Sequence, residues 1–199
     1  NCLYPYDLLL TEIMADPSPT VGLPDVEYLE LYNNSKKVFN LKGFILATPR
    51  KEIALPDYVL LPGQYVVLYK GAQNLFINNN LGLDDFLTLT NSGDDVALVA
   101  PDGTIIHTVS YTLDWYKNSS KSDGGWSLEM VNPQNICNVD GTNWQASENG
   151  NGGTPGNRNA VWSITADQNF DGALRALVLD ETKVRLFLTK LLIRSQLLI

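Results

Sequence analysis

The acidic residues near the start of the chain are the first candidates for chemistry. The stretch 11–35, TEIMADPSPTVGLPDVEYLELYNNS, holds three glutamates and two aspartates. In a regular strand successive side chains point to opposite faces, so Glu27 and Glu30 diverge. Glu12 and Glu30 can still meet across paired strands, where two close carboxylates raise a pKa or bind a cation. The alternative is that one of the two accepts hydrogen bonds from backbone or from a tyrosine hydroxyl.

A second acidic motif lies near the C-terminus. Asp167, Asn169 and Asp171 alternate in DQNFDG and precede a glycine, which is the spacing of a calcium loop. The twelfth position of such a loop is Val178 instead of a bidentate glutamate, so the oxygen shell is incomplete. Two interpretations stay open, a calcium site and a plain linker turn. No other cofactor is expected.

Histidine and cysteine offer little catalytic chemistry. The single histidine, His107, lies in the alternating segment TIIHTVSY, without a G-x-S-x-G elbow or a Cys/His signature. We therefore expect a histidine that is packed or exposed at the rim, and we predict that the chain is not an enzyme. Two cysteines, Cys2 and Cys137, cannot form a zinc site by themselves; in an oxidising compartment they can pair as a disulfide, and otherwise they are unrelated thiols.

Aromatic side chains are the remaining candidates for binding. Trp115 and Tyr116 fall in a loop-like segment, DWYKNSS, where flat rings can stack on a sugar or anchor a peptide. The sequence therefore predicts an exposed aromatic platform there. Trp126 and Trp144 are expected to be structural.

The elements that must position these residues are short β-strands. Nine segments alternate apolar and polar residues and are separated by Gly, Pro, Asn and Asp, which is typical of a sandwich or barrel. The expected strands are 8–14, 26–33, 43–48, 58–61, 64–70, 86–90, 95–101, 104–111 and 126–131. Leu61-Pro-Gly-Gln64 has the residues of a type II turn, and Pro101-Asp-Gly-Thr104 those of a tight hairpin. Residues 132–160 are irregular.

Composition limits the classes of function. The 199 residues carry a net charge of −8, and 44% of them are hydrophobic. Residues 1–163 hold 18 acids and 9 bases, so they should repel phosphate backbones, and no nucleic-acid partner is expected. No apolar run reaches the ~18 residues of a membrane span, so no transmembrane segment is predicted.

The residues after Ser163 change in composition towards leucine, valine and basic side chains, and the chain ends on an apolar run. We expect one domain over residues 6–160 and, over 161–199, a linker with the beginning of a truncated second module. The stretch from Glu181 fits either a strand or an amphipathic helix.

Taken in order, several motifs resemble the lamin tail domain family. They are TEIMADP, VEYLELYNNS, NLKGFIL, IALPDYVLLPGQYVVLYK and FLTLTNSGDDVALVAPDGTIIHTVSY. The closing GGWSLEMVNP, Asn143-Trp144 and GGTPGNRN resemble the bacterial secreted or surface branch of that family. The tail resembles the first strand of another immunoglobulin-like module.

The resemblance implies an all-β, immunoglobulin-like sandwich without catalytic residues. It leads us to expect an extracellular, cell-surface or periplasmic interaction or adhesion module within a larger protein, with a protein or glycan partner or neighbouring domains of its own chain. A structural spacer beside a catalytic domain, and a calcium-dependent or carbohydrate-binding module, are the alternatives.

Overall fold

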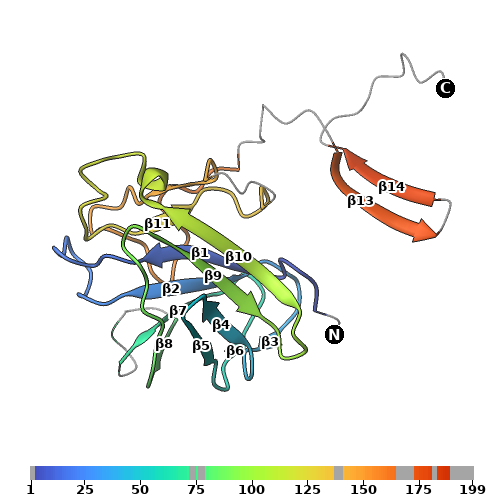
Figure 1. Cartoon of the computed structure of the whole chain (residues 1–199), viewed down its shortest axis with the longest axis horizontal. Coiled ribbons are helices and arrows are strands. Elements are labelled where there is room, and N and C mark those ends of the chain that lie inside the picture. Colours follow the sequence, from blue (N-terminus) through green and yellow to red (C-terminus); the bar gives the residue numbers. More distant parts are fainter. Residues whose placement is uncertain are drawn as a thin grey trace, which may run out of the picture. The chain divides into compact units, whose positions relative to one another are not determined.

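A computed structural model describes residues 3–71, 75, 79–136, 141–164, 173–180 and 183–188 of the chain. Two compact units are present, residues 1–164 and residues 165–199. The first unit is a β-sandwich (Figure 1). The second contains an antiparallel pair, β13 (Ala173–Asp180) and β14 (Lys183–Leu188), so the stretch after Glu181 forms a strand and not a helix.

The larger layer of the sandwich is a six-stranded sheet in the order β12-β11-β1-β2-β7-β8. Its pairs are antiparallel except β7 and β8, which run parallel. The strands are β1 (Leu8–Met14), β2 (Tyr28–Asn33), β7 (Tyr65–Lys70), β8 (Asn80–Leu83), β11 (Leu128–Met130) and β12 (Trp144–Ala146).

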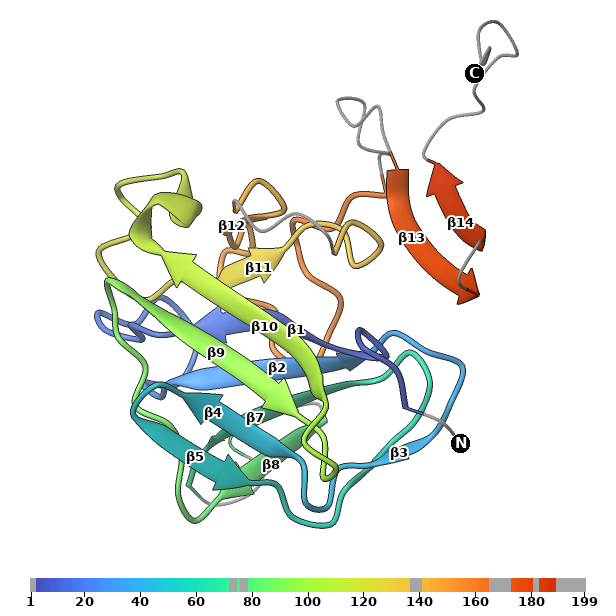
Figure 2. The same cartoon turned by 45° about the vertical axis from the view of Figure 1, so that its right-hand side comes forward.

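The smaller layer is a four-stranded sheet in the order β10-β9-β4-β5, which lies over the larger one (Figure 2). Its strands are β4 (Ile45–Thr48), β5 (Lys51–Ala54), β9 (Gly93–Val99) and β10 (Ile105–Thr112). A short ribbon, β3 (Phe39–Asn40) with β6 (Val59–Leu60), lies outside both sheets. A 3-10 helix, η1 (Leu113–Tyr116), follows β10.

The core lies between the inner faces of the two sheets. Alternation along β2 sends Leu29 and Leu31 into this core, where they are fully buried. The residue Tyr28 points to the opposite face and belongs to a second apolar cluster with Met14, Val67 and Tyr69. Both faces of the larger sheet are therefore covered, which is why β1 is buried along its whole length.

The predicted fold class is confirmed: the chain is all-β and its first unit is an immunoglobulin-like sandwich. The turn at 61–64 is also confirmed, because Gln64 N–H donates to Leu61 O at 3.1 Å and Gly63 has a φ of 73°. That φ lies in the left-handed region, which glycine adopts without steric strain because it has no Cβ. The hairpin at 101–104 joins β9 to β10 as expected.

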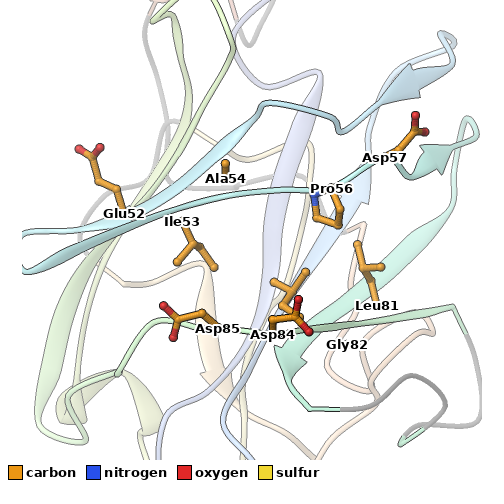
Figure 3. A pocket seen from close by; sticks show the side chains of 10 residues that line it. Glu52, Ile53, Ala54, Pro56, Asp57, Leu81, Gly82, Asp84 and Asp85 are labelled. Atoms are coloured by element: carbon orange, nitrogen blue, oxygen red, sulfur yellow. The ribbon is translucent and has the colours of Figure 1, made fainter.

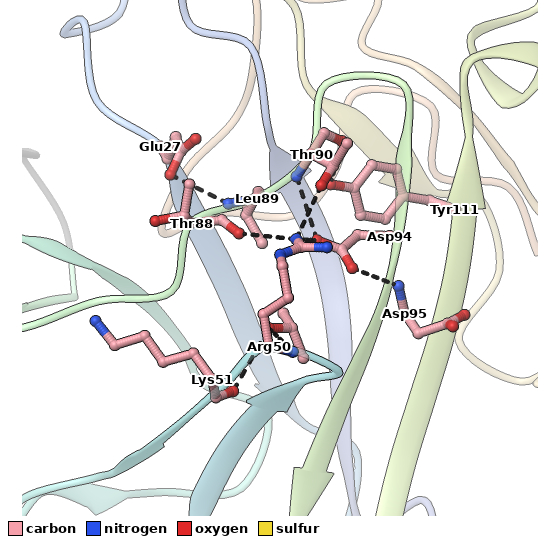
Figure 4. Close-up of polar contacts among 10 residues, drawn as sticks. Glu27, Arg50, Lys51, Thr88, Leu89, Thr90, Asp94, Asp95 and Tyr111 are labelled. Carbon is pink, nitrogen blue, oxygen red and sulfur yellow. Dashed lines mark hydrogen bonds and ion pairs between the residues drawn. The ribbon is translucent and has the colours of Figure 1, made fainter.

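The predicted strand at 86–90 is wrong. Its apolar residues Phe86, Leu87 and Leu89 are buried, but side chains instead of a neighbouring strand hold the segment (Figure 4). Arg50 Nη2 donates to Thr88 O at 3.2 Å and to Thr90 Oγ1 at 2.8 Å, and it forms an ion pair with Asp94. Glu27 accepts the N–H of Leu89 at 3.4 Å. Among the described residues of the first unit, four strands lie outside the expected ranges; they are β3, β5, β8 and β12, and all are short.

Candidate functional site

Three buried glutamates form a row across the larger sheet. In the strand register Glu12 of β1 lies directly opposite Glu30 of β2 on one side and Glu129 of β11 on the other. All three residues have 0% of their surface exposed. The hypothesised pair is therefore adjacent in the fold, and the sequence missed its third member, Glu129.

A β-bulge brings Glu12 to this face. The pairing of β1 with β2 shifts between Leu10 and Glu12, so Thr11 is an extra residue in β1. In a regular strand Glu12 would share the face of Leu10, which points into the core. The bulge turns Glu12 to the outer face of the sheet, where Glu30 already lies.

Glu12 is the most heavily hydrogen-bonded member of the row. Its Oε1 accepts from the Tyr28 hydroxyl at 2.5 Å, from Ser127 Oγ at 2.6 Å and from Thr154 N–H at 2.9 Å. Glycine at position 153 leaves room for these contacts, since a Cβ there would lie 2.6 Å from both Glu12 Oε1 and the Tyr28 hydroxyl.

The other two glutamates bind the same covering segment. Glu30 Oε2 accepts the N–H of Gly156 at 2.7 Å, and its Oε1 accepts from Thr11 Oγ1 at 2.8 Å. Glu129 accepts from Thr154 Oγ1 at 2.8 Å and from Val161 N–H at 3.1 Å. The row thus holds residues 154–161 onto the sheet. Its partners include backbone N–H groups and a tyrosine hydroxyl, as in the alternative interpretation of the pair, and also serine and threonine hydroxyls.

Asn159 fixes the same segment beside the bulge. Its Nδ2 donates to Thr11 O at 2.8 Å and to Met130 O at 2.9 Å. These carbonyls belong to β1 and β11, one residue beyond the Glu12–Glu129 pair at which the pairing of the two strands ends, so the amide bridges the two strands there. Asn159 Oδ1 is buried and has no hydrogen-bond partner among the described residues.

Burial sets the protonation of the row. It raises the pKa of Glu12 to about 7, helped by the charge of Glu129, while hydrogen bonds from Ser127 and Tyr28 act in the opposite direction. Burial, followed by the charge of Glu12, also raises the pKa of Glu30 well above its ordinary value. In the described part of the chain no lysine or arginine forms an ion pair with the row. It therefore carries fewer than three negative charges at neutral pH.

The row does not have the form of a metal site. Within the described ranges, no group of three or more His, Cys, Asp or Glu residues is arranged to hold a metal ion. The predicted calcium ligands Asp167, Asn169 and Asp171 lie outside the described residues, as do Cys2 and Cys137. Calcium binding and the disulfide stay predictions.

His107 is a buried residue of β10. A register shift between Ile105 and His107 places Ile106 and His107 both inward, which breaks the expected alternation. His107 Nδ1 accepts the N–H of Leu10 at 2.9 Å, and burial lowers the pKa of the ring to about 4. The imidazole is therefore neutral at physiological pH and satisfies a buried backbone donor.

The predicted aromatic platform is wrong. Trp115 is 9% exposed and Tyr116 is 4% exposed, because η1 turns both rings inward. The rings of Trp115 and Trp144 lie 5.9 Å apart, and the Tyr116 hydroxyl donates to Trp126 O at 3.2 Å. Both residues anchor the segment after β10 to the sandwich and offer no open stacking surface.

An open groove lies elsewhere, between β5 and β8, the edge strands of the two sheets (Figure 3). Its volume is about 610 Å³. Ile53 and Leu81 point into it, and every charged residue of its lining is acidic. The lining comprises Glu52, Ile53, Ala54, Pro56, Asp57, Leu81, Gly82, Leu83, Asp84 and Asp85. The sequence could not indicate this groove because both of its strands were missed.

The architecture places the first unit among immunoglobulin-like β-sandwich domains. The sequence profile of the Lamin Tail Domain family matches residues 5–113, which is more than half of the chain. The chain therefore belongs to the lamin tail domain family. No curated protein matches the chain.

The family is generally non-catalytic and often serves in protein interaction. Glu12 and Glu30 lie inside the matched residues, whereas Glu129 and the covering segment 154–161 lie beyond them. No helix among the described residues is both long and apolar enough for a membrane crossing.

Proposed function

We propose that this chain is a non-catalytic interaction domain that binds a partner protein through an exposed sheet edge. The observation that carries the proposal is the groove between β5 and β8, where the two sheets end side by side and the lining is open to solvent. Domains of this family also often serve in protein interaction.

The positions of the ionisable groups support a non-catalytic role. General acid or base catalysis requires a group within hydrogen-bonding reach of a substrate. Glu12 and Glu30 are fully buried and His107 is 5% exposed, and all three already bond to protein atoms. Their raised and lowered pKa values follow from burial and their structural contacts.

A structural spacer is the second candidate, and one observation favours it. The first unit is hydrogen-bonded almost to its last residue, since Val161 N–H donates to Glu129 and Ser163 N–H donates to Val131 O at 2.9 Å. Because the chain is hydrogen-bonded to the sandwich up to Ser163, a segment that follows it would start from a fixed position on the sandwich.

Extracellular or cell-surface placement and membership of the bacterial secreted branch are part of the proposal. The acidic composition and the closing motifs in residues 124–159 support them. Non-reducing mass spectrometry tests the associated Cys2–Cys137 disulfide, and two free thiols would count against an oxidising compartment.

Site-specific photo-crosslinking in the cells that produce the chain tests the interaction role. A photoreactive side chain is placed in turn at five exposed positions distributed over the sandwich: Thr20, Val38, Ala54, Ser110 and Asn157. We expect a discrete cross-linked protein from Ala54, beside the groove, and none from Ser110. An absence of products at all five positions would overturn the interaction role and leave the spacer.

A further inference from the structure

The groove between β5 and β8 is bounded by two sheet edges whose outer sides have no partner strand among the described residues. In β8, Leu83 O accepts the N–H of Gly71 and Asn79 O accepts the N–H of Val67, so odd-numbered residues face β7. Alternation of a parallel ladder then directs the N–H and C=O of Gly82 away from β7. An outward pair of backbone groups is a template for another strand.

The two edges differ in how well they are protected. β5 carries the charged residues Lys51 and Glu52, and Pro56 lies two residues beyond its end; both features discourage strand pairing. β8 has the sequence NLGL, without charge or proline. Its central glycine is partly exposed and has no side chain to keep another backbone away. The unprotected edge is therefore β8.

The charges around the groove select the partner. Four lining residues, Glu52, Asp57, Asp84 and Asp85, are acidic and exposed, and no lining residue is basic. Lys51 Nζ pairs with Asp85 at 2.6 Å. In the described part of the chain the other three carboxylates form no ion pair. This surface attracts a cationic segment and repels acidic ones.

We propose that the groove binds an extended segment of a partner protein in which lysine or arginine alternates with apolar residues, and that the segment adds as a strand to the β8 edge at Gly82. The proposal rests on the interaction role proposed above and names the class of partner. Backbone pairing at Gly82 supplies the geometry. The basic side chains meet the acidic rim, and the apolar ones pack over Ala54 and Pro56.

Fluorescence anisotropy of the full chain with the labelled peptide KVKVKVKV tests the proposal, and RLRLRLRL serves as a second probe. Three matched controls separate the contributions: EVEVEVEV reverses the charge, KVKVKVKV with alternate N-methylated amides blocks strand pairing, and a scrambled peptide, KKVVVKVK, breaks the alternation. The contact site is read from backbone amide NMR shifts, which we expect at residues 81–85.

Substitutions in the chain test the same backbone and charge contacts from the side of the groove. Gly82→Pro removes the outward N–H without removing a ladder bond to β7, and we expect about tenfold weaker binding. Gly82→Ala keeps the N–H and serves as its control. Glu52→Gln with Asp84→Asn should weaken binding and flatten its salt dependence. Urea unfolding checks that each variant is folded.

Three results would overturn the inference. They are binding that survives N-methylation, binding that ignores Gly82→Pro, and the absence of binding by both basic peptides. None of these would affect the photo-crosslinking test, because a partner bound at another face would still cross-link. An absence of cross-linking with intact peptide binding would instead remove the interaction role and leave a groove without a natural occupant.

Discussion

Replacing the two central glutamates by glutamine should change how stability depends on pH. In Glu12→Gln the amide oxygen can take the position of Oε1, and the NH₂ group can donate to Thr154 Oγ1, which lies 3.5 Å from Oε2. In Glu30→Gln the oxygen can accept from Gly156 N–H, and the NH₂ group can donate to Thr11 Oγ1. The double variant therefore keeps the hydrogen bonds and removes the titration.

The direction in which stability changes with pH depends on whether the folded or the unfolded chain binds more protons. The pKa of Glu12 is raised from 4.5 to about 7, so between these values the folded chain holds a proton that the unfolded chain has lost. Stability then falls as pH rises, by about 1.4 kcal/mol per pH unit, or about 3 kcal/mol across this window. The raised pKa of Glu30 acts in the same direction.

His107 changes the pH dependence of stability in the opposite direction. Its pKa is lowered from 6.5 to about 4, so between these values the unfolded chain holds the additional proton and stability rises with pH. In the wild type this rise opposes the fall due to the glutamates. In the double variant the lowered pKa of His107 still acts, so its contribution to stability should rise from pH 4.5 to 6.5. Glu27, whose pKa is raised by partial burial, opposes part of this rise.

Urea unfolding at half-unit steps from pH 4.5 to 8 measures both effects. Relative to pH 4.5, the wild type should lose at least about 3 kcal/mol more than the double variant by pH 8. His107→Asn in the double-variant background is the control, and it should abolish the rise. Equal pH slopes in the wild type and the double variant would refute the argument that the row is protonated because it is buried.

Three further substitutions test the structural roles. Gly153→Ala should destabilise by about 1–3 kcal/mol in urea unfolding, because its Cβ would lie 2.6 Å from Glu12 Oε1, whereas Gly150→Ala, with nothing within 4 Å, should change stability by less than about 0.5 kcal/mol; equal effects would contradict the close packing of the covering segment. Trp115→Ala should lower the free energy of unfolding by about 3–5 kcal/mol, because the ring is buried against Trp144. An unchanged free energy of unfolding would instead support the interpretation of Trp115 as an exposed binding residue. Asp94→Ala removes the partner of Arg50 and should hasten proteolytic cleavage within residues 86–92, measured by mass spectrometry; unchanged cleavage would show that the apolar side chains alone hold this segment.

The strand pattern was largely predictable from the residues. Alternating apolar runs bounded by glycine and proline identify β1, β2, β7, β9 and β10 to within about two residues at each end, because the side-chain period of two is a local property. The segment 86–90 shows the limit of this reasoning, since it has the same period but lies against side chains instead of a strand. Short strands such as β5 and β8 have too few residues to show a period.

By itself the sequence determined the fold class, the main turns, the family resemblance and the idea that Glu12 and Glu30 are neighbours. Only the tertiary structure decided that a bulge at Thr11 turns Glu12 outward, that Glu129 joins from β11, and that residues 154–161 cover the row. It also showed that Trp115 is buried and that an open groove lies between β5 and β8. The reason is physical: alternation along a strand is local, whereas register, bulges and burial depend on contacts between residues far apart in the chain, such as Glu12 and Thr154.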